Sequence, residues 1–274
     1  MNAFFRHFLH LLIDGSFLTG LSAYSLVRLT QSWFGIPAED AVAPLAFFGT
    51  VAGYNFIKYD ALARMKGRSL NPRIKAIAFV SFGFLVAAGI CFLRLRWAAQ
   101  LTVLGFGALT VLYALPFFPN RQNARNWAGV KIYIVSLCWM GVTAVLPLVQ
   151  ARVPFDLAVA VLCLRRFLFV LVLVLIFEII DLANDDPLLR TIPQWIGVKR
   201  TKQLGHALLL LLMALNWIDF RTYPDFILNI SIFLLTGFFL FFAHERRPRH
   251  YTLLWAESIP IIWWIADLLL RHFL

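Results

Sequence analysis

The sequence predicts an all-α fold, a polytopic bundle of about nine transmembrane helices that forms a single domain over residues 1–274. Of the 274 residues, 61% are hydrophobic and only 14% are charged, whereas a soluble domain carries about 25% charged residues. Apolar segments of about the length that crosses a bilayer recur along the whole chain. The loops between them are mostly short, which leaves no separate soluble domain.

Each expected helix corresponds to one apolar segment. The first segment carries Asp14 and runs on for about twenty residues, so it is predicted to be a retained span and not a cleaved signal peptide. The second contains Gly49 and Gly53, which allow a neighbouring helix to approach closely. In chain order, the segments are 8–29, 41–57, 74–93, 98–118, 130–150, 155–180, 203–218, 224–243 and 253–273.

The net charge of +11 is concentrated in loops on one side of the predicted membrane. Most of the 25 Lys and Arg residues precede the first segment or lie in the loops after the second, fourth, sixth and eighth. Because cytoplasmic loops carry such an excess, the N-terminus and these loops are predicted to be cytoplasmic and the C-terminus external. Topology and attraction to anionic membrane lipids account for the charge, and no nucleic-acid partner is expected.

Three carboxylates end the sixth segment. Glu178, Asp181 and Asp185 stand at positions i, i+3 and i+7, so on a continuing helix they project from one face. Charges at the mouth of a membrane helix are costly unless they meet water, cations or a functional partner. A divalent cation would relieve the mutual repulsion, so the pattern predicts half of a metal–diphosphate site. The alternative is that Asp181 and Asp185 are solvated loop carboxylates beside Arg190.

The deeper charges of the sixth segment leave several roles open. Glu178 lies one turn deeper than Asp181. It is a metal ligand or a supporting group, or it forms a salt bridge with Lys131 or Arg166. Arg165 and Arg166 lie within the segment, where a desolvated arginine must find a partner. A structural ion pair and a role in substrate binding are both compatible with their position.

Further polar residues are predicted on the same cytoplasmic side. Asn55 and Lys58 lie near the end of the second segment, and Lys199 and Arg200 follow the loop after the sixth. Asn55 offers an amide oxygen to a cation or a donor to a phosphate, although an amide is equally suited to packing between helices. Lys58, Lys199 and Arg200 carry positive charge that would neutralise a phosphorylated ligand.

These two polar motifs resemble those of the UbiA superfamily of intramembrane prenyltransferases. The first family motif is Asn-x-x-x-Asp-x-x-x-Asp, and the second is Asp-x-x-x-Asp, usually followed by Thr-x-Pro and a Gly. The second is matched here by Asp181 and Asp185, with Thr191-Ile192-Pro193 and Gly197 downstream. Lys131 resembles a basic position of the family at the start of the fifth helix. The residues around the second motif look like an uncharacterised bacterial branch, which implies the bacterial inner membrane.

The resemblance implies a UbiA-like fold and a definite activity. Mg²⁺ would bind the diphosphate of an isoprenoid, and the isoprenoid chain would be transferred to an aromatic or lipid acceptor. The implied catalytic residues are Asp181 and Asp185. The implied metal ligands are these two together with Glu178 and Asp60, and the implied diphosphate-binding residues are Asn55, Lys58, Lys131, Lys199 and Arg200.

The first motif departs from the family pattern. Tyr59 and Ala63 stand where the family has carboxylates. Asp60 is one position late, about 100° around the helix from Tyr59, and would enter the site only if the helix has unwound there. The alternative to an enzyme is therefore a catalytically degenerate relative that binds an isoprenoid lipid or a partner without turnover. A transporter is a third hypothesis, against which stands the lack of recognisable inverted repeats.

Overall fold

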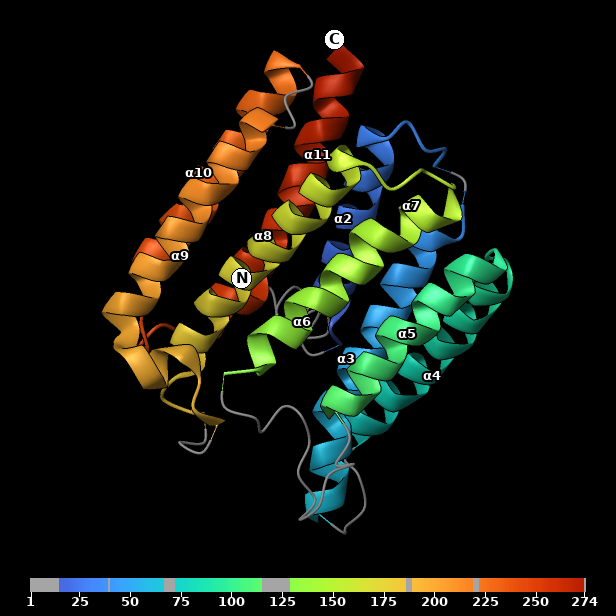
Figure 1. Ribbon diagram of the computed structural model, residues 1–274. Helices are drawn as coiled ribbons and strands as arrows, with labels where there is room; N and C mark the ends of the chain where they lie inside the picture. The colour runs from blue at the N-terminus through green and yellow to red at the C-terminus, as the bar shows by residue number, and fades with distance from the viewer. Residues whose placement is uncertain are drawn as a thin grey trace.

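The computed structural model describes residues 15–38, 40–66, 72–114, 129–185, 189–218 and 222–273. Within these ranges the chain is helical and forms no strand, as Figure 1 shows. The prediction of an all-α bundle is therefore confirmed. The helices, with the labels of Figure 1, are α2 (Phe17–Trp33), α3 (Val42–Lys66), α4 (Pro72–Leu93), α5 (Trp97–Ala114), α6 (Lys131–Met140), α7 (Leu146–Gln150), α8 (Leu157–Asp181), α9 (Ile192–Ile218), α10 (Tyr223–Phe242) and α11 (Glu257–Phe273).

Two helices contain a wider π-helical turn. The segment Gly141–Val145 joins α6 to α7, and the segment Tyr251–Ala256 leads directly into α11. Each therefore belongs to one continuous helix, which accounts for the predicted spans 130–150 and 253–273. Asp14 and the beginning of the first predicted span lie outside the described residues.

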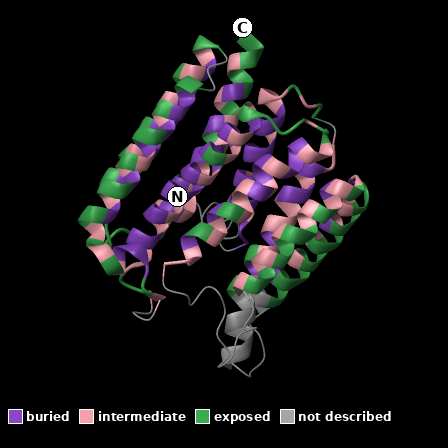
Figure 2. Ribbon diagram, in the orientation of Figure 1, coloured by how far each residue is buried: buried purple, intermediate pink, exposed green. Residues whose placement is uncertain are grey.

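Helix α8 is the centre of the bundle. In its most apolar window 72% of the residues are buried inside the protein, against 6% for α4. Figure 2 shows the same contrast, with buried residues gathered on the inner helices and exposed ones along α4 and α5. The main hydrophobic core joins α8 to α2, α9, α10 and α11 around Phe169, Phe233 and Trp263.

The helices make this an integral membrane protein. Five of those described are long and apolar enough to cross a membrane, and the shorter Trp97–Tyr113 is also apolar. Helix α2 is less apolar because its inner face carries Ser22, Ser25, Thr30 and Gln31, all of which are buried. Polar residues of this kind pack between membrane helices instead of facing lipid.

Arg165 and Arg166 both find partners inside the bundle. Arg165 donates to Asn216 Oδ1 at 2.9 Å and lies over the rings of Trp33 and Phe233. Arg166 donates to the carbonyl oxygen of Leu26 at 2.9 Å and to the Thr30 hydroxyl at 3.2 Å. These contacts join α8 to α2 and α9. They give both arginines a structural role, and Arg166 does not pair with Glu178.

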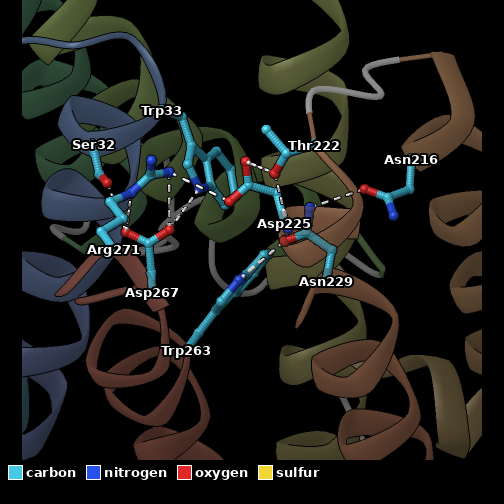
Figure 3. Close-up of polar contacts among 9 residues, drawn as sticks. All are labelled: Ser32, Trp33, Asn216, Thr222, Asp225, Asn229, Trp263, Asp267 and Arg271. Atoms are coloured by element: carbon cyan, nitrogen blue, oxygen red, sulfur yellow. Dashed lines mark hydrogen bonds and ion pairs between the residues drawn. The ribbon is translucent and has the colours of Figure 1, made fainter. Parts of the chain in front are cut away.

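A buried polar network ties together the end of the bundle that contains the C-terminus (Figure 3). Asp267 is fully buried and accepts hydrogen bonds from Ser32 Oγ at 2.6 Å and Trp33 Nε1 at 3.3 Å. Arg271 forms an ion pair with Asp267 at 3.1 Å and reaches Asp225 at 3.5 Å. The network thus joins α2, α10 and α11 through one buried carboxylate.

Candidate functional site

The carboxyl ends of α3 and α8 lie at the same end of the bundle, opposite the C-terminus (Figure 1). Helix α8 stops at Asp181, and the chain continues into one hydrogen-bonded turn. The backbone N–H groups of Asn184 and Asp185 both donate to the Asp181 carbonyl oxygen, at 2.8 and 2.9 Å. This turn brings the carboxylates of Asp181 and Asp185 near enough to interact electrostatically.

The partner of Asp181 is Arg249, in the loop between α10 and the π-helical segment Tyr251–Ala256. Arg249 Nε lies 3.3 Å from Asp181 Oδ1, and the two side chains are 63% and 35% exposed. A pair exposed to this degree contributes little to stability, so Asp181 can exchange Arg249 for another cation at low cost. The alternative drawn from the sequence put Arg190 beside Asp181. The one feature of the sequence consistent with the contact is the predicted topology, which places Arg249 and Asp181 on the same side of the membrane.

Three motif residues hold buried oxygen atoms that make no hydrogen bond. They are Asp185 Oδ2, Thr191 Oγ1 and Asn55 Oδ1. A buried polar atom left without a partner costs about 1–3 kcal/mol, and each such atom in a folded protein calls for an explanation. The carboxylate and amide oxygens suit a hard divalent cation or a donor on a ligand.

Glu178 holds the start of α9 against the end of α8. Its side chain is 2% exposed, and Oε2 accepts a hydrogen bond from the backbone N–H of Ile192 at 3.2 Å. One residue earlier, the backbone N–H of Thr191 donates to Gln194 Oε1 at 2.9 Å, as in a helix capping box. Glu178 thus holds the Thr-Ile-Pro segment against the end of α8.

Lys131 is the one predicted basic ligand that the described residues bring to the second motif. It is the first residue of α6 and lies near enough to Glu178 and Asp181 to interact with both charges. Lys199 and Arg200 are exposed on α9, beyond a break in the helix at Gly197. Gly197 has φ +80° and ψ 155°, a conformation that is essentially limited to glycine.

In the first motif, the amide nitrogen of Asn55 joins neighbouring segments, and its amide oxygen accepts no hydrogen bond. Asn55 is 3% exposed and donates through Nδ2 to the Gly15 carbonyl oxygen at 3.0 Å and to Ser81 Oγ at 2.9 Å. These bonds join α3 to α4 and to the beginning of α2, while Asn55 Oδ1 stays unpaired. Both interpretations of Asn55 from the sequence are therefore compatible with its surroundings.

Glu257 adds a carboxylate beside the first motif. The Thr19 hydroxyl donates to it, with both carboxylate oxygens at 3.0 Å, and Lys58 lies near enough to interact with its charge. Glu257 comes directly after the π-helical segment Tyr251–Ala256, and such segments are frequent at functional sites. The segment from Arg249 to Glu257 therefore pairs with Asp181 at its first residue and interacts with the charge of Lys58 at its last.

Helix α3 continues without a break through Lys66. The unwinding on which a role for Asp60 depends is thus not present in its backbone. The side chains of Tyr59, Asp60 and Ala63 lie outside the described residues, and the role of Asp60 stays a prediction.

Asp181 and Asp185 can provide two of the ligands of a Mg²⁺ ion, but not its whole coordination sphere. Among the described residues, no three His, Cys, Asp or Glu side chains are placed to hold a metal ion together. Mg²⁺ is usually bound by one or two carboxylates together with the phosphates of a substrate, and it retains several waters. Asp181, which is partly exposed, and Asp185, with one unpaired oxygen, provide such a pair.

Comparison with solved structures identifies the fold. A UbiA homologue from Archaeoglobus fulgidus, solved with Cd²⁺ bound, superimposes with a TM-score of 0.65 at 14% identity, over 95% of this chain and 98% of that chain. A structure concerned with digeranylgeranylglyceryl phosphate synthase gives 0.59 at 16% identity, over 97% and 98%. No protein-family model and no curated protein matches the sequence. The chain therefore has the UbiA fold over nearly its whole length.

Proposed function

We propose that this protein is a UbiA-like, Mg²⁺-dependent prenyltransferase that moves an isoprenoid chain from its diphosphate to an aromatic or lipid acceptor. It would lie in the bacterial inner membrane, with the N-terminus and the site facing the cytoplasm. The observation that carries the proposal is the pair Asp181 and Asp185 in a UbiA fold. One buried oxygen of this pair has no partner, and Lys131 lies beside it.

Each candidate site residue would have a separate role in binding the diphosphate. Asp181 and Asp185 would hold Mg²⁺, which when bound neutralises charge on the diphosphate and polarises the bond to the isoprenoid. Lys131 would bind the diphosphate from the first turn of α6. Asn55 Oδ1 and Lys58 would complete the site from α3, and Lys199 and Arg200 would attract the anionic substrate from the cytoplasm. Glu178 would act by keeping the Thr-Ile-Pro segment in place, and Asp60 remains a candidate metal ligand.

The reaction needs one bond to break and one to form. The bond between the allylic carbon and the diphosphate oxygen breaks with both electrons leaving on the oxygen, and the carbon then bonds to the acceptor, which loses a proton. Positive side chains aimed at the leaving oxygen stabilise the charge that develops there. The apolar interior of the bundle would keep water from the cationic carbon, which would otherwise give the alcohol.

The alternative is a relative that binds an isoprenoid lipid or a partner without turnover. Tyr59 and Ala63 favour it, because they remove the carboxylates that the family has at those positions. The ion pair between Arg249 and Asp181 also favours it, since it gives Asp181 a partner without any metal. For the acceptor, the similarity to the digeranylgeranylglyceryl phosphate synthase structure supports a lipid as well as an aromatic ring.

Metal dependence of binding separates the two candidates. The purified protein in nanodiscs should bind farnesyl or geranylgeranyl diphosphate in Mg²⁺, and EDTA should weaken binding by about tenfold or more, a loss of about 1.4 kcal/mol. Equilibrium binding of a radiolabelled diphosphate measures this. Farnesol, which has the same chain without the diphosphate, is the matched control and should not respond to EDTA. Tight binding that EDTA leaves unchanged would contradict the enzyme and support the non-catalytic relative.

A further inference from the structure

An apolar groove of about 440 Å³ lies between α9 and α10. Its lining includes Leu209, Met213, Phe233 and Phe241, and several lining side chains are exposed, so the groove opens toward the bilayer. This volume lies within the range of small-ligand sites, about 300–1,000 Å³.

Two glycines let α9 and α10 approach each other closely beside the groove. Helices α9 and α10 touch at Gly205, where an added Cβ would lie 2.4 Å from Leu240 Cδ2. One turn away, Gly237 lines the groove, and an added Cβ there would lie 3.3 Å from Leu209 Cδ1. The groove is thus a product of the sequence of both helices.

Two basic side chains lie at the cytoplasmic end of the groove. Lys202 Nζ donates to the Phe241 carbonyl oxygen at 2.7 Å, and Arg247 Nε donates to the Phe242 carbonyl oxygen at 3.4 Å. These contacts cap the last turn of α10, where cations are favourable. They do not use all the donors, since a lysine has three and an arginine five.

We propose that this groove binds one anionic phospholipid of the cytoplasmic leaflet. An acyl chain would lie along Met213, Phe233 and Gly237, and Lys202 and Arg247 would bind the phosphate. The assignment rests on charge complementarity. The groove is apolar except for two cationic side chains at its cytoplasmic end, and anionic lipids are found in the cytoplasmic leaflet. The bound lipid would hold the outer pair of helices α9 and α10 together. This inference does not depend on prenyl transfer.

Native mass spectrometry of the protein in detergent tests the site, with titration of phosphatidylglycerol and phosphatidylcholine. Each basic residue near an anionic surface is worth about fivefold in affinity. Lys202→Gln and Arg247→Gln should each weaken phosphatidylglycerol binding about fivefold and phosphatidylcholine binding less, because the choline cation offsets the charge of the phosphate that both lipids carry. Gly237→Leu should fill the groove and remove both lipids.

Two matched substitutions serve as controls. Arg246→Gln removes an exposed charge next to Arg247, and Gly107→Leu adds a side chain on α5 where nothing lies within 4 Å of the new Cβ. Neither should change lipid binding, and thermal unfolding without lipid should show all variants folded. Equal affinity for the two lipids, or equal losses in the control variants, would overturn the proposal. Displacement of phosphatidylglycerol by farnesyl diphosphate would also overturn it, because the groove would then belong to the prenyl substrate.

Discussion

Replacing Asp185 by Asn should lower Mg²⁺-dependent binding of a prenyl diphosphate by about tenfold, the same loss as that expected in EDTA. The amide has the size of the carboxylate and leaves the backbone bond from Asp185 N to the Asp181 carbonyl oxygen in place. It removes the negative charge from the unpaired, buried oxygen that is expected to hold the cation. Equilibrium binding in Mg²⁺, measured beside the wild-type protein, gives the ratio.

Glu245→Gln is the control for this substitution. Glu245 is an exposed carboxylate in the loop between α10 and the π-helical segment Tyr251–Ala256, so its neutralisation changes the net charge by the same amount. It should leave binding within about twofold of wild type, the range of an exposed, screened charge. Unchanged binding by Asp185→Asn would show that the cation and diphosphate are held elsewhere.

Replacing Asp267 by Ala should destabilise the bundle by about 3 kcal/mol. The substitution leaves the buried donors of Ser32 and Trp33 without an acceptor, and Arg271 loses its fully buried partner. Thermal unfolding in detergent should show a clear loss, with Glu245→Ala as an exposed control. Diphosphate binding by the folded fraction should be unchanged, because the network lies at the opposite end from the aspartates. An unfolding midpoint equal to wild type would contradict the structural role given to this network.

The helices of the fold can be predicted from the sequence because each depends on a continuous run of apolar residues. A run of apolar residues long enough to cross a bilayer has few options other than a helix, and each of the nine predicted segments contains the greater part of a helix described here. The closeness of Asp181 and Asp185 was equally accessible, because they are neighbours in the sequence, but the helix on which they were expected to share a face ends at Asp181. The helix boundaries were less certain, and α2 extends to Trp33 instead of ending near residue 29.

The remaining parts of the site depend on contacts between distant segments. Nothing local in the sequence pairs Arg249 with Asp181, or joins Glu257 to Thr19 and Lys58. These contacts arise because the final helix packs against α2 and α10, while the π-helical segment at its start packs against α8. The same holds for Arg166, whose acceptors are a carbonyl oxygen and a hydroxyl of α2 and not the carboxylate considered from the sequence.

Release of pyrophosphate by the purified wild-type protein is the most direct test of the proposed function. The protein in nanodiscs would receive a prenyl diphosphate, Mg²⁺ and either an aromatic acceptor or a membrane-lipid extract. Pyrophosphate and prenylated acceptor should appear in equal amounts, and both should be lost in EDTA and in Asp181→Asn and Asp185→Asn. Tight binding of the prenyl diphosphate that persists in EDTA and in both variants, with no pyrophosphate released for any acceptor, would contradict the assignment as a prenyltransferase.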